Sequence, residues 1–100
     1  MKIPSSFEIA GRKVKVVENS RLGHENEWLG AAVYREDKIE LQPSTKDRPR
    51  TKDCLNQTFC HELVHWVLYS MGKHELNRDE EFVDLFGTFL HQALKTMKYS

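Results

Sequence analysis

The chain has 100 residues, of which 39% are hydrophobic and 30% charged, and its formal net charge is zero. This length fits a single domain with one small hydrophobic core. The balanced charge gives no overall basic surface, so we do not expect nucleic-acid binding. No apolar run approaches the roughly 20 residues that span a bilayer, and residues 1–6 lack an apolar signal segment. We therefore expect a cytoplasmic protein without a membrane partner. We also expect it to be a monomer.

The first part of the chain, residues 1–42, has the pattern of β-strands. Residues 7–17 alternate between apolar and polar side chains around a turn glycine, Gly11, which predicts a strand or a hairpin. Residues 18–27 are polar and predict a loop. Residues 28–34 and 38–42 predict a second hairpin through a turn at residues 35–37. We therefore expect a small N-terminal antiparallel sheet made of two hairpins.

The second part of the chain has the pattern of two helices, at residues 53–71 and 78–97. A polar loop that contains two prolines precedes the first helix, Thr51 or Asp53 can cap it, and Gly72 can end it. The sequence therefore predicts an α+β fold, in which the sheet packs on two C-terminal helices within one domain of residues 1–100.

The first of these helices contains the segment His61-Glu62-Leu63-Val64-His65. Two histidines four residues apart lie on one face of a helix, where both imidazoles can bind one metal ion. This spacing is typical of zinc peptidases, in which a third protein ligand leaves one position open for water. The flanking residues are apolar, which predicts a buried helix whose polar groups must be paired or metal-bound. We expect Zn²⁺ as the cofactor and Glu62 as the group that accepts the proton of the water.

The next helix offers carboxylates for the third ligand. Glu80 and Asp84 are four residues apart and share a face, so one can bind zinc while the other orients a histidine. Glu81 is the alternative ligand, and His74, just beyond the first helix, is a weaker candidate. The segment that starts at Asn77 also has the form of a capping box, in which Glu80 would bond to the helix start instead.

The two helical segments together resemble the thermolysin-type gluzincins, and the chain looks like a minimal, zincin-like member of that class. The resemblance rests on the histidine motif and on Glu80, Asp84, Gly87 and Thr88. It implies that Glu80 is the third zinc ligand and that Asp84 holds the first histidine, with Glu81 still the alternative. The plan of the whole chain is also similar to small phage and prophage HExxH proteins, which include regulatory peptidases that act on repressors.

The small residues Gly30, Ala31 and Ala32 stand in a predicted strand. In gluzincins an edge strand beside the metal helix pairs with the substrate backbone, and the resemblance implies this role for these residues. The alternative is structural, since small side chains also let a helix pack closely on a strand.

These features predict a zinc metallopeptidase that hydrolyses peptide bonds of a peptide or protein substrate, with Glu62 as general base. Tyr69, His74 and Tyr34 are candidates for the group that stabilises the oxyanion. One alternative is a non-catalytic, zinc-stabilised module that binds peptides. Another is a regulatory peptidase dedicated to one repressor-like partner.

Overall fold

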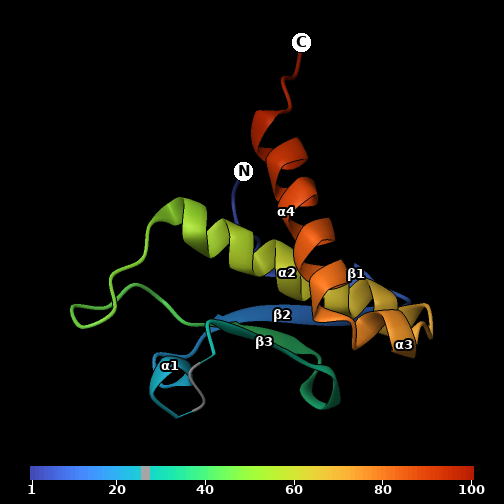
Figure 1. Ribbon diagram of the computed structural model, residues 1–100, viewed down its shortest axis with the longest axis horizontal. Helices are drawn as coiled ribbons and strands as arrows, with labels where there is room; N and C mark the ends of the chain where they lie inside the picture. The colour runs from blue at the N-terminus through green and yellow to red at the C-terminus, as the bar shows by residue number, and fades with distance from the viewer. Residues whose placement is uncertain (26–27) are drawn as a thin grey trace.

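A four-stranded sheet forms one layer of the protein (Figure 1). The computed structural model describes residues 1–25 and 28–100, so the last two positions of the loop expected at residues 18–27 lie outside the described residues. The first hairpin turns through Ala10 and Gly11, whose φ angles of 50° and 76° match the tight turns that join antiparallel strands. The strands follow the order β1-β2-β4-β3 and are β1 (Ser6–Ile9), β2 (Arg12–Glu18), β3 (Gly30–Val33) and β4 (Lys38–Leu41).

Both predicted hairpins are confirmed, because β1 pairs with β2 and β3 with β4 in antiparallel fashion. The expectation of a wholly antiparallel sheet is wrong at one junction, since β2 and β4 are parallel and the sheet is mixed. This order places Ile39 and Leu41 of β4 in the interior, where they are 0% and 4% exposed. It leaves the small residues of β3 at the edge. The connection to β3 is not all loop, because it contains the short helix α1 (Leu22–Glu25).

Two long helices follow the sheet, α2 (Lys52–Ser70) and α4 (Glu80–Thr96), with the short α3 (His74–Asn77) between them. The predicted helix boundaries are confirmed to within two residues. Thr51 caps α2 by accepting a hydrogen bond from the backbone N–H of Cys54. Gly72, with φ of 70°, ends it, and the N–H groups of Gly72 and Lys73 bond to the last carbonyls of the helix.

The helix α2 is buried on two sides, which explains why apolar residues occur on more than one of its faces. On one side Trp66 and Phe59 pack with the sheet, and the Phe59 ring meets that of Phe7 edge to face. On the other side Val64 packs with Val83 of α4. The α+β fold is thus three layers deep, with the sheet, then α2, then α4 (Figure 1).

The helices α2 and α4 cross in close contact at Gly87. A β-carbon at this position would lie 3.1 Å from the Cα and 3.3 Å from the backbone nitrogen of His61. Only glycine allows the two backbones to come this near without displacing one of them. The crossing therefore fixes how the start of α4 lies over the histidines of α2.

Within the described residues, no helix is both long and apolar enough to cross a membrane.

Candidate metal site

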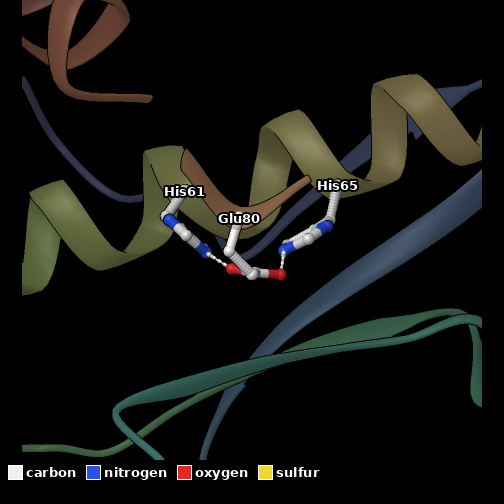
Figure 2. Close-up of side chains that lie close together, drawn as sticks. All are labelled: His61, His65 and Glu80. Atoms are coloured by element: carbon white, nitrogen blue, oxygen red, sulfur yellow. Dashed lines mark ion pairs between the residues drawn. The ribbon is translucent and has the colours of Figure 1, made fainter. Parts of the chain in front are cut away.

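The predicted ligands His61, His65 and Glu80 come together in the structure (Figure 2). The two rings lie one turn apart on α2, with centroids separated by 5.0 Å. The Glu80 carboxylate lies between them: its Oε2 is 3.3 Å from Nε2 of His61, and its Oε1 is 3.3 Å from Nε2 of His65. One atom from each of the three residues lies within 4.8 Å of the other two. Two imidazoles and one carboxylate are the donor set of many catalytic zinc sites.

Glu80 is free to take this position because another residue caps α4. Asp79 is the N-cap, and its side chain accepts a hydrogen bond from the N–H of Phe82 at 3.1 Å. The capping box expected with Asn77 as N-cap and Glu80 as its partner is therefore wrong, since Asn77 ends α3. Glu81 is exposed and does not belong to the three-residue group.

The side chain of Asn77 instead orients His65. Its Nδ2 donates to the hydroxyl of Tyr34 at 3.0 Å, so its Oδ1 is left as an acceptor, 2.6 Å from Nδ1 of His65. Nδ1 of the ring therefore faces the amide oxygen of Asn77, and Nε2 faces the Glu80 carboxylate. Sequence reasoning missed this role of Asn77, because the only local signal, an Asn before a helix, suggested a cap.

The other histidine, His61, has Asp84 beside its second ring nitrogen. Nδ1 of His61 lies 3.5 Å from Oδ1 of Asp84, which is the placement predicted for this carboxylate. Both histidines therefore present Nε2 to the same point, each with its other ring nitrogen next to an oxygen acceptor. This arrangement around paired imidazoles is typical of histidines that bind metals.

Glu62 lies next to the ligands and is 7% exposed. Burial, and secondly the negative charge of Glu80, raise the pKa of Glu62 to about 7, although a hydrogen bond from the backbone N–H of Ala32 acts in the opposite direction. A carboxyl group with such a pKa exchanges protons near neutral pH, as a general base must.

These groups open into a cleft of about 660 Å³ between α2, α4 and β3. Three of the lining residues are acidic, namely Glu62, Glu80 and Asp84, and no lysine or arginine is among the described residues that line it. Glu80 and Asp84 lie beside ring nitrogens of the histidines, and their side chains are 67% and 71% exposed. Imidazole nitrogens and carboxylate oxygens that converge in one cleft are ligand types that Zn²⁺ binds.

The strand β3 forms one wall of the cleft and lies at the edge of the sheet, next to β4. A β-carbon on Gly30 would lie 2.6 Å from Cγ2 of Thr58, so the absence of a side chain there lets α2 pack against the strand. Ala31 and Ala32 also line the cleft, and the N–H of Ala32 points to Glu62. Close packing explains the glycine at position 30. The two alanines present only small side chains to the cleft.

The three candidates for oxyanion stabilisation lie in different places. Tyr34 lines the cleft, and its hydroxyl donates to the carbonyl of His65 at 3.4 Å. Tyr69 stacks on Tyr34 with centroids 4.0 Å apart but is not among the residues that line the cleft. His74 is exposed on α3 and does not line it either. Of the three, Tyr34 is the one within reach of a bound peptide.

No family model, curated protein or solved structure matches this chain. The resemblance to gluzincins therefore depends on the site residues themselves.

The role of Asn77 can be tested by the Asn77→Ala variant. Loss of the acceptor for Nδ1 releases the His65 ring, so we expect zinc affinity to fall roughly 10–100-fold, as measured by competition with a chromophoric chelator. Asn56→Ala is the matched control, because Asn56 lies on α2 and donates to the carbonyl of Met1, away from the site. Equal affinities for the two variants would show that Asn77 does not position the ligand.

Proposed function

We propose that this protein is a zinc-dependent metallopeptidase in which His61, His65 and Glu80 hold the metal. The observation that carries the proposal is the convergence of both Nε2 atoms on the Glu80 carboxylate. The Nδ1 atom of each histidine lies next to a side-chain oxygen, of Asp84 for His61 and of Asn77 for His65. Three protein ligands match a catalytic zinc site, which keeps one position open, whereas a structural site is closed by four. When bound, zinc supplies a Lewis acid and lowers the pKa of a coordinated water.

Glu62 is the proposed general base. It stands directly beside the ligands on α2, is nearly buried, and has a pKa raised to about 7. Its carboxylate accepts a proton from the attacking water and later returns it to the leaving amine. The neighbouring N–H of Ala32 holds this carboxylate in place at the wall of the cleft.

The edge strand β3 is the proposed binding place for the substrate backbone. An extended peptide can add to the edge of a sheet through main-chain hydrogen bonds, and β3 runs beside Glu62 and both histidines. Ala31 and Ala32 leave room for such a chain, while Trp28 and Leu29, which are 56% and 53% exposed, line the same cleft. The substrate class that fits is an unfolded or extended protein segment.

The Glu62→Gln variant tests the catalytic part of the proposal. Glutamine keeps the size of the side chain but cannot accept the proton, so we expect loss of cleavage of an unfolded protein such as reduced casein by at least about 100-fold. Zinc content should stay unchanged, because Glu62 is not a ligand. Loss of zinc would contradict this role, and wild-type protein that holds zinc but cleaves neither casein nor candidate repressor partners would favour a peptide-binding module.

The choice of third ligand is tested by comparing Glu80→Ala with Glu81→Ala. These neighbours are both exposed at the start of α4, but only the Glu80 carboxylate reaches the histidines. We expect Glu80→Ala to weaken zinc binding at least about tenfold more than Glu81→Ala, as measured by chelator competition. The reverse ranking would assign the ligand to Glu81.

A further inference from the structure

The helix α4 carries an apolar stripe that is wider than α2 can cover. Its inner part is buried against α2, where Val83 is 0% exposed. Its outer part, which we call the outer stripe, remains in water and consists of Leu85, Phe86 and Phe89 together with Met97, the residue that follows the helix; they are 51%, 52%, 64% and 51% exposed. Their spacing of three or four residues through Phe89 places them on one side of the helix. Figure 1 shows that α4 crosses α2 and that its later turns project away from the sheet.

Charged residues are distributed unevenly along the same helix. Its first turn carries Glu80 and Glu81, and Lys95 stands in its last turn. Glu81 and Lys95 are about four turns apart and share one side of the helix, next to the outer stripe, although Lys95 also lies 3.0 Å from Oδ1 of Asp53 on α2. If two such helices lie antiparallel, the acidic end of each meets the basic end of the other.

We propose that the outer stripe binds a second copy of this chain through an antiparallel, two-fold pairing of the two α4 helices. A two-fold axis near Thr88 places Glu81 of each copy opposite Lys95 of the other. The same axis brings Phe86 and Phe89 of both copies together at the centre, where aromatic side chains contribute most to binding. This assembly differs from the monomer expected from the sequence and is independent of the proposed peptidase function.

The size of the outer stripe fits a weak, reversible dimer. Phe86 and Phe89 carry roughly 150–250 Å² of surface each and are about half exposed, so they leave about 200 Å² in water on each copy, and Leu85 and Met97 add to this area. Even with a polar rim, such an interface is at the small end of the range for specific association, which begins at roughly 1,200 Å². The dimer should therefore dissociate on dilution.

Sedimentation equilibrium of the full chain tests the proposal. We expect wild-type protein to approach twice the monomer mass of 11.8 kDa as its concentration rises, and Phe89→Glu to raise the dissociation constant at least about tenfold. Val17→Glu is the control, because Val17 is 36% exposed on the sheet and lies outside the stripe. A wild-type chain that stays monomeric at every concentration, or equal effects of the two variants, would overturn the dimer. The outer stripe would then have to bind a partner other than a second copy.

The orientation of the pair is tested by exchanging charges. Glu81→Lys alone places two lysines opposite each other and should weaken the dimer, while the double variant Glu81→Lys with Lys95→Glu should restore it. Lys95→Glu also removes the exposed ion pair between Lys95 and Asp53, so thermal unfolding is recorded for each variant. Failure of the double variant to recover association, with unchanged folding, would contradict the antiparallel arrangement.

Discussion

The close crossing of α4 over α2 is the contact on which the candidate site depends. Gly87 lets the two backbones approach until a β-carbon would lie 3.1 Å from the Cα of His61. Because of this approach, the start of α4 reaches the two histidines, and Glu80 and Asp84 lie on either side of the His61 ring. The crossing also buries Val83 between the helices. One glycine contact thus links the stability of the helical layer to the geometry of the site.

The set of donor atoms at the site is the second constraint. Three carboxyl groups and two imidazoles line one cleft, and no lysine or arginine is among the described residues that line it. Nδ1 of each histidine lies next to an oxygen atom, Oδ1 of Asn77 or Oδ1 of Asp84, and both Nε2 atoms face the Glu80 carboxylate. The arrangement offers two nitrogen donors and one oxygen donor to a metal ion, and these are ligand types that the proposed zinc ion prefers.

Local sequence patterns predicted the parts of the fold and site that local geometry decides. The spacing of His61 and His65 on one helix, and of Glu80 and Asp84 on the next, places each pair on one face, and the structure brings both faces together. The hairpins followed from alternation and turn residues in the same way. The parallel pairing of β2 with β4 and the contact of Asn77 with His65 could not be predicted, because both depend on segments brought together only by tertiary packing.

The most direct test of the metal site is the zinc content of the purified protein, measured per chain by elemental analysis. We expect about one zinc in the wild type and in His74→Ala, whose histidine is exposed and outside the ligand group, and almost none in His61→Ala. A wild-type chain that contains no zinc and takes up none when zinc is added would contradict the metal site and, with it, the peptidase function.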